Sequence, residues 1–183
     1  MGTFVALLRA INLGSHNKVN MPQLRDLFED LGYERVQTYL QSGNVVFQTS
    51  TDPTSEDVAG QIERQISAEL GLDVTVLVRS LAEIEQTVSK NPFTNRGAEP
   101  TILHGTFLCE LPDPKLASSD LGYSGTDEFL VSGRDVYLFC PTGYGRTKLN
   151  NAFWERKLKT QGTTRNWRTV GALLDMAREV ETA

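Results

Sequence analysis

Hydrophobic runs in this sequence are only a handful of residues long, far short of the roughly 20 residues that a membrane-spanning helix needs. The N-terminus also lacks a basic segment followed by an apolar one, as a secretory signal peptide would have. The two cysteines, Cys109 and Cys140, are too few for a disulfide framework and suit small buried hydrophobes in a reducing compartment. We therefore expect a cytoplasmic protein with no membrane partner.

Recognisable catalytic and cofactor motifs are also lacking. The sequence has no G-x-S-x-G elbow and no metal-site spacing of Cys, His or Asp, and His16 and His104 lie far apart. Residues 143–148 (GYGRTK) are about two residues too short for a Walker A loop and do not form a dinucleotide fingerprint. We therefore predict no metal and no cofactor. Enzymatic activity stays open, because phosphoryl chemistry needs mainly positioned cations.

Acidic residues outnumber basic ones, and the chain carries a net charge of −5. The imbalance is uneven: residues 141–183 hold eight Lys or Arg and four Asp or Glu, a net charge of +4, so residues 1–140 carry −9. Non-specific affinity for duplex DNA depends on many phosphate contacts. Nucleic acid is therefore a disfavoured partner, whereas a local anion site in the basic tail is compatible with this charge balance.

Hydrophobic periodicity in the first half predicts the order strand, helix, strand, strand, helix, strand. The first helix begins at Asn20, with Gln23 as the partner in a capping box, and ends at Gly32. The strands are residues 3–9, 36–40, 44–49 and 74–78, and the second helix extends from Pro53 to Gly71. This order is that of the split βαβ, or ferredoxin-like, fold.

The second half repeats this order after a helix that starts at a Ser80–Glu83 capping box. Its strands are residues 102–109, 129–131, 136–140 and 163–165; residues 112–125 are turn-rich, Thr147 is expected to cap one helix, and a last helix follows. We predict an α+β fold with two ferredoxin-like (split βαβ) units in tandem. The expected division is 1–79 for the first unit, 80–100 for a helix and linker, and 101–183 for the second unit with the C-terminal helix.

Polar residues are expected to collect at one edge of the first unit. Its first and third strands are antiparallel neighbours, so the end of one lies beside the start of the other. The residues concerned are Arg9, Asn12, Lys18, Gln41, Ser42 and Asn44. They allow two interpretations: a binding site, or side chains that satisfy loop backbone groups, with Arg9 at the rim.

The same argument places residues 141–148 opposite residues 163–168 in the second unit. Two glycines precede the expected helix there, and free N–H groups at a helix N-terminus favour an anion. Arginine can fork onto phosphate or carboxylate, and Trp167 offers a stacking face. The predicted anion site consists of Gly143, Gly145, Arg146, Lys148, Arg165, Asn166, Trp167 and Arg168. Alternatively, Arg165 pairs with acids such as Glu155, and Trp167 belongs to the core.

Several longer segments are specific enough to indicate a family. They are LLRAINLG with Lys18, Met21, Leu24 and Arg25, then LGY, TYLQSGNVVF, NPF, GRTKL and TRNWRTV. In these segments, which span nearly its whole length, the chain resembles a widespread, mainly bacterial family labelled only as a domain of unknown function. It departs from the family pattern at Ala10, where the family typically has glycine. The resemblance implies an α+β fold of ferredoxin-like character and no established activity, cofactor or substrate.

Three functions stay open from the sequence. The leading one is binding of a small anionic ligand, phosphorylated or nucleotide-like, at the predicted anion site. The second is RNA binding on the sheet, for which the strands at Thr3 and Asn44 offer only Phe4 and Phe47 as stacking residues. The third is a protein-interaction module without catalysis. The oligomeric state also stays open.

Overall fold

The computed structural model describes residues 1–51, 53–119 and 121–183. The chain forms two compact units, one made of Met1–Gln86 with Ala172–Ala183 and the other made of Thr87–Gly171. The sequence assigns the last helix wholly to the second unit, whereas in the structure that helix begins in the second unit and ends in the first. No helix in the described part of the chain is long and apolar enough to span a membrane.

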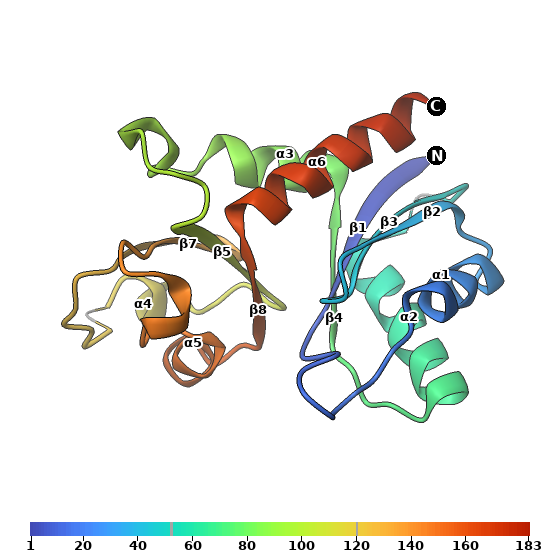
Figure 1. Cartoon of the computed structure of the whole chain (residues 1–183), viewed down its shortest axis with the longest axis horizontal. Helices are drawn as coiled ribbons and strands as arrows, with labels where there is room; N and C mark the ends of the chain where they lie inside the picture. Colours follow the sequence, from blue (N-terminus) through green and yellow to red (C-terminus); the bar gives the residue numbers. More distant parts are fainter. Residues whose placement is uncertain (52, 120) are drawn as a thin grey trace. The chain divides into compact units, whose positions relative to one another are not determined.

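The first unit has the predicted ferredoxin-like order of elements. These are β1 (Gly2–Leu8), α1 (Met21–Asp30), β2 (Glu34–Tyr39), β3 (Asn44–Thr49), α2 (Ser55–Leu70) and β4 (Val76–Ser80). The strands pair antiparallel in the order β2-β3-β1-β4, and α1 and α2 lie on one side of the sheet (Figure 1). The split βαβ arrangement predicted for this unit is confirmed.

Apolar side chains at helical spacing join α1 and α2 to this sheet. The buried helical positions are Met21, Leu24, Leu27, Phe28, Val58, Ile62 and Ile66. They pack against alternate strand residues, such as Phe4, Ala6 and Leu8 of β1, because successive side chains of a strand point to opposite faces. Burial of each large apolar side chain contributes about 1.5–3 kcal/mol, so this layer is the main source of stability in the unit.

Of the two capping boxes predicted from the sequence, the one before α3 is present and the one before α1 is not. Ser80 and Glu83 form the reciprocal box before α3 (Leu81–Ser89): the Ser80 N–H donates to Glu83 Oε2 at 2.8 Å, and the Glu83 N–H donates to Ser80 Oγ at 3.2 Å. The box predicted for α1 is wrong. Asn20 is the N-cap residue, but within the described chain its side chain makes no cap hydrogen bond. The start of α1 therefore keeps N–H groups that Asn20 does not satisfy.

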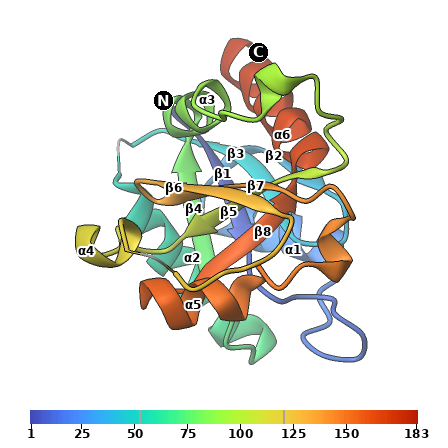
Figure 2. The same ribbon diagram turned by 90° about the vertical axis from the view of Figure 1, so that its left-hand side faces the viewer.

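The second unit repeats the topology with shorter elements. They are η1 (Thr94–Arg96), β5 (Leu103–Leu108), α4 (Pro114–Ala117), β6 (Glu128–Ser132), β7 (Asp135–Phe139), η2 (Tyr144–Arg146), α5 (Asn151–Leu158) and β8 (Gly162–Asn166). The sheet order is β6-β7-β5-β8, and Figure 2 shows this sheet with α4 and α5. Helix α4 lies in the turn-rich segment predicted at 112–125, of which Asp120 is outside the described residues. The two predicted ferredoxin-like units are thus both present.

The last helix, α6 (Trp167–Thr182), ends within the first unit. The Arg35 guanidinium on β2 donates to the Val180 carbonyl at 3.0 Å, and Arg178 pairs with Glu85 of α3 at 2.9 Å. The Thr3 hydroxyl on β1 donates to Glu181. The C-terminal part of α6 is therefore tied to the first sheet and to α3 by polar contacts far apart in sequence.

Candidate functional site

Asn12 connects the two loops in which the first polar cluster was predicted. Its side-chain nitrogen donates to the Val19 carbonyl at 2.9 Å and to the Gln41 carbonyl at 2.8 Å, while its side-chain oxygen accepts from the Val19 N–H at 2.9 Å. The amide thus fixes the β1–α1 loop against the turn between β2 and β3. This role is structural, because both amide donors are already used.

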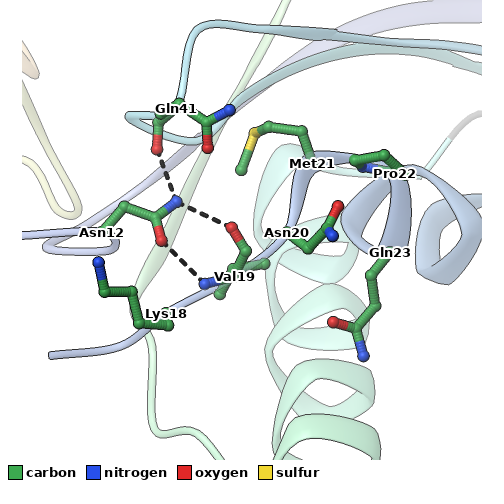
Figure 3. A pocket seen from close by; sticks show the side chains of 8 residues that line it. All are labelled: Asn12, Lys18, Val19, Asn20, Met21, Pro22, Gln23 and Gln41. Atoms are coloured by element: carbon green, nitrogen blue, oxygen red, sulfur yellow. Dashed lines mark hydrogen bonds between the residues drawn. The ribbon is translucent and has the colours of Figure 1, made fainter. Parts of the chain in front are cut away.

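A cavity of about 640 Å³ opens beside this connection, at the start of α1. Its lining residues are Asn12, Lys18, Val19, Asn20, Met21, Pro22, Gln23 and Gln41, and Lys18 is the one charged side chain among them. In Figure 3, Lys18 and Gln41 lie to the left of Asn20, and Gln23 lies to its right. We refer to this space as the α1 cavity. It joins one cation, several amides and the N-terminus of a ten-residue helix.

The backbone around the α1 cavity is strained. Six non-glycine residues of the described chain have a positive φ, and four of them lie in the two bordering loops: Ala10 (55°), Asn12 (53°), Asn17 (46°) and Leu40 (60°). Asparagine tolerates this region, whereas alanine and leucine pay about 1–2 kcal/mol each, and such strain persists where the surroundings hold it, often at functional sites. At Ala10 the φ of 55° is one that glycine adopts without strain, so glycine would suit this position better than alanine.

Of the remaining predicted members of this cluster, Asn44 and Ser42 support the turn between β2 and β3, and Arg9 is bound to the segment before β4. Asn44 is completely buried, and its side-chain nitrogen donates to the Tyr39 carbonyl at 2.7 Å and to Ser42 Oγ at 3.0 Å. The Arg9 N–H donates to the Thr75 carbonyl at 2.9 Å. The structure therefore brings the predicted cluster together, with Lys18 and Gln41 at the cavity and Asn44 inside the fold.

The predicted anion site of the second unit is brought together only in part. Tyr144 in the loop before α5 stacks on His104 of β5, with ring centroids 4.6 Å apart, and His104 Nε2 lies 3.4 Å from the side-chain nitrogen of Asn166. The loop therefore lies beside the end of β8, as the topology predicts. Thr164 hydrogen-bonds to Tyr144 on this same side of the sheet.

Arg165 lies on the opposite face of β8, because strand side chains alternate. The ring of Trp167, the first residue of α6, lies against Gly105, the residue of β5 that pairs with Arg165. Arg165 is 8% exposed and donates to Thr163 Oγ1 at 2.7 Å and to the Thr164 carbonyl at 3.1 Å. Burial lowers the pKa of the Arg165 guanidinium to about 10. Trp167 packs edge-on against Tyr137, with centroids 6.1 Å apart. These two residues therefore do not meet the loop that carries Arg146, and Trp167 belongs to the core.

The helix start predicted at Thr147 is wrong. Gly143 precedes a 3₁₀ turn, η2, that contains Gly145 and Arg146, and α5 starts only at Asn151 with Asn150 as its N-cap. The Thr147 hydroxyl instead donates to Asp127 at 2.6 Å. The two glycines consequently do not present a helix N-terminus to an anion. They shape the turn that places Tyr144 on His104.

Asn166 and Arg168 are used at the start of α6. Asn166 Oδ1 accepts from the Arg168 N–H at 2.9 Å, and its nitrogen donates to the Thr101 carbonyl at 3.2 Å. Lys148 lines a separate cavity of about 480 Å³ at the start of α5. The other residues lining it are Gly122, Tyr123, Ser124, Thr147, Asn150, Ala152, Phe153 and Arg156. We refer to it as the α5 cavity.

Burial shifts the pKa of two titratable groups in the second unit, His104 and Cys140. Burial lowers the pKa of His104, which keeps its imidazole neutral. Burial raises the pKa of the Cys140 thiol to about 11, with the nearby Asp127 carboxylate adding to the effect, so this cysteine is not an activated nucleophile. Among the residues that the structure describes, no group of three or more His, Cys, Asp or Glu could hold a metal ion.

Sequence reasoning missed some of the residues that line the two cavities. The sequence predicts only a helix start for residues 20–23 and a loop for Val19, yet all five residues line the α1 cavity. The sequence offers one signal, Pro22. Proline has no N–H, so a proline in the first turn leaves few N–H groups at the helix start, and whether a side chain caps them then matters more. Arg156 and residues 122–124 carry no such signal, because their proximity depends on loop packing.

Comparisons with known proteins agree with this architecture. The two sheets define the chain as an α+β protein of two tandem ferredoxin-like units. It belongs to the family described as "Protein of unknown function (DUF1697)", whose model matches residues 1–137. A solved structure described as that of the conserved bacterial protein SP0830 from Streptococcus pneumoniae is similar, with a TM-score of 0.68, 20% identity, and coverage of 96% of this chain and 98% of that one. No curated protein matches the chain.

Proposed function

We propose that this protein binds a small anionic ligand, phosphorylated or nucleotide-like, in the α1 cavity. The observation that carries the proposal is the composition of that cavity: Lys18, several amides and the start of α1 line a space of about 640 Å³, and no acidic side chain is among these lining residues. A cavity of this size is within the range of ordinary small-molecule sites.

Physical chemistry favours an anion at this position. A helix N-terminus carries about half a positive elementary charge, and its first N–H groups point outward. At α1 the Asn20 side chain makes no cap hydrogen bond within the described chain, so it does not satisfy the Gln23 N–H, and Pro22 contributes no N–H. Lys18 adds a full positive charge from the preceding loop. An anion here therefore combines a charge pair with backbone hydrogen bonds.

The α5 cavity is the competing location for an anion within the described chain. It is lined by Lys148 and Arg156, but the Asn150 side chain already accepts from the Phe153 N–H at 3.0 Å and so caps α5. The buried Asp127 carboxylate also accepts hydrogen bonds from two residues that line this cavity, Tyr123 and Thr147. A capped helix and a nearby carboxylate both weaken anion binding, which favours the α1 cavity.

RNA binding on a sheet face is less well supported. Both aromatic side chains that the sequence offers for stacking, Phe4 and Phe47, are buried, and their rings stack on each other with centroids 6.0 Å apart. All residues of β3 and β5 are buried as well. Base stacking needs exposed aromatic faces, so the sheets do not offer such a platform.

A thermal-shift screen with inorganic phosphate, sugar phosphates and nucleotides tests the proposal. A ligand at about 100 times its dissociation constant should stabilise the wild type by about 2.7 kcal/mol, a rise in Tm of roughly 5–10 °C. Lys18→Met should lose most of this shift. Lys148→Met is the matched control at the α5 cavity, and Lys115→Met is the control for an exposed lysine away from both; both should keep the shift.

Two outcomes would contradict the proposal. If the shift disappeared in Lys148→Met and persisted in Lys18→Met, the anion would bind at the α5 cavity. If no anion stabilised the wild type, the α1 cavity would not be an anion site, and interaction with a protein partner would become the better hypothesis.

A further inference from the structure

Strand β6 forms an edge of the second sheet (Figure 2) and differs there from the other edge strands of the described chain, β2, β4 and β8. In β2 the pairing with β3 is irregular between Glu34 and Gln37, and Arg35 has a φ of +53°. Such a bulge protects an edge against further pairing. Strands β4 and β8 are mostly buried. By contrast, β6 pairs with β7 in unbroken register, and none of its five residues is buried.

Two residues of β6, Phe129 and Val131, direct their backbone N–H and C=O groups away from β7. The Cys140 N–H, directly after β7, donates to the Ile102 carbonyl before β5 at 2.8 Å. The direction of hydrogen bonding alternates along an antiparallel strand, so residues 135, 137 and 139 bond to β6, where their partners are 132, 130 and 128. The N–H groups of Phe129 and Val131 therefore make no hydrogen bond within the described chain.

Side chains hold β6 as a regular strand on one face and leave a leucine on the other. Phe129 packs edge-on against Trp154, with ring centroids 5.2 Å apart, and Val131 packs against the same core. Leu130 points to the opposite face and is 43% exposed. Residues 129–131 contain no charge and no proline, the residues with which proteins usually protect such an edge.

We infer that β6 is a self-association edge: it pairs antiparallel with β6 of a second copy of this chain, with Leu130 at the two-fold axis. Phe129 of each copy then faces Val131 of the other, and each of these pairs exchanges both of its N–H···O=C bonds. Leu130 faces Leu130 as a non-hydrogen-bonded pair, in which side chains approach most closely. The pairing satisfies the outward amides and removes both leucines from water.

The charges at the two ends of β6 favour a second copy as the partner. The strand begins at the acidic Glu128 and is followed by the basic Arg134 in the turn to β7. In the antiparallel dimer Glu128 of one copy lies diagonally across from Arg134 of the other, within reach of long side chains. Glu128 also pairs with Arg96 of its own chain at 2.7 Å, and a carboxylate can accept from both arginines. Two-fold symmetry forms the Glu128–Arg134 pair twice, so the edge is complementary to itself.

Sedimentation equilibrium and amide hydrogen exchange of the whole chain test this inference. Each copy contributes a five-residue strand, fewer residues than the roughly 20–30 of a standard interface, so the dimer should form at high protein concentration and dissociate on dilution. Exchange at the Phe129 and Val131 amides should slow as the dimer forms. The Leu130 amide bonds to β7 in the monomer already, so its exchange should change less.

Substitutions in β6 separate edge pairing from association through another surface. Val131→Pro removes an outward N–H, which an edge strand tolerates, and it should abolish the dimer and keep the far-ultraviolet circular dichroism spectrum. Val131→Ala, which keeps the N–H, is the matched control and should still dimerise. Leu130→Lys places like charges opposite each other and should also abolish the dimer. Leu111→Lys, at a leucine that is 67% exposed outside β6, should dimerise like the wild type.

A wild type that stays monomeric up to the millimolar range, with fast exchange at the Phe129 and Val131 amides, would overturn the inference. A dimer that persists in Leu130→Lys would also overturn it, because the copies would then meet elsewhere. Neither result bears on the α1 cavity of the first unit, and a failure of phosphate binding there would leave the self-association edge intact.

Discussion

Gly43, in the turn that carries Gln41 to the α1 cavity, should not tolerate a side chain. Its φ is +77°, and a Cβ atom there would lie 2.5 Å from Ile11 Cδ1 and 2.9 Å from Leu8 Cβ. The left-handed conformation costs alanine about 1 kcal/mol, and forcing a methyl group into a packed region adds about 1–3 kcal/mol. We therefore expect Gly43→Ala to lower the free energy of unfolding by about 3 kcal/mol.

Gly133→Ala is the matched control, because Gly133 lies in the corresponding turn between β6 and β7. Its φ is +61°, and no heavy atom lies within 4 Å of a Cβ built there, so only the conformational cost of about 1 kcal/mol applies. Urea unfolding followed by far-ultraviolet circular dichroism measures both variants, and 3 kcal/mol corresponds to a fall in midpoint of about 1.5 M. Equal losses in the two variants would refute the close packing of the turn against Ile11 and Leu8.

Three further changes test other parts of the structure. Asn20→Asp should raise the free energy of unfolding by about 0.5 kcal/mol through the α1 dipole and weaken phosphate binding, two effects of opposite sign that urea unfolding and calorimetry separate. Ser80→Ala should cost about 1 kcal/mol in urea unfolding, because the Glu83 N–H loses its acceptor; no loss would show that the capping box does not stabilise α3. Burial lowers the pKa of His104 in the folded chain, so the unfolded chain binds the extra proton, and the free energy of unfolding should fall as pH drops below about 6.5. His104→Gln should remove that part of the dependence in urea unfolding between pH 5 and 8, and an unchanged profile would contradict the buried neutral imidazole.

The order of elements could be predicted because it depends on local patterns that tertiary packing reinforces. Met21, Leu24, Leu27 and Phe28 repeat at helical spacing and are the buried positions of α1. The Ser80–Glu83 box needs only two residues three apart in sequence, and it forms as predicted. The same reasoning was wrong at Asn20, since the sequence shows a suitable residue and not whether its side chain turns toward the helix.

The candidate site was harder to predict, because it depends on side-chain direction. The topology predicts that the loop of Tyr144 lies beside the end of β8. Tyr144 stacks on His104, which pairs with Asn166 at that end, so this prediction is confirmed. The assignment of Arg165 to that loop ignored strand alternation, which turns Arg165 to the other face of β8 from Thr164. In the first unit, the prediction that Asn12 and Gln41 lie together succeeded because neighbouring antiparallel strands fix where their loops meet.

The most direct test of the central claim is an amide chemical-shift titration of the isotope-labelled chain with inorganic phosphate. We expect saturable shifts at Val19, Gln23 and Leu24, around the start of α1, and their loss in Lys18→Met. The amides of Asn151 and Phe153 at the start of α5 should move little. Saturable shifts confined to the start of α5, or a response at α1 that Lys18→Met leaves intact, would contradict an anion site built on Lys18 and the N-terminus of α1.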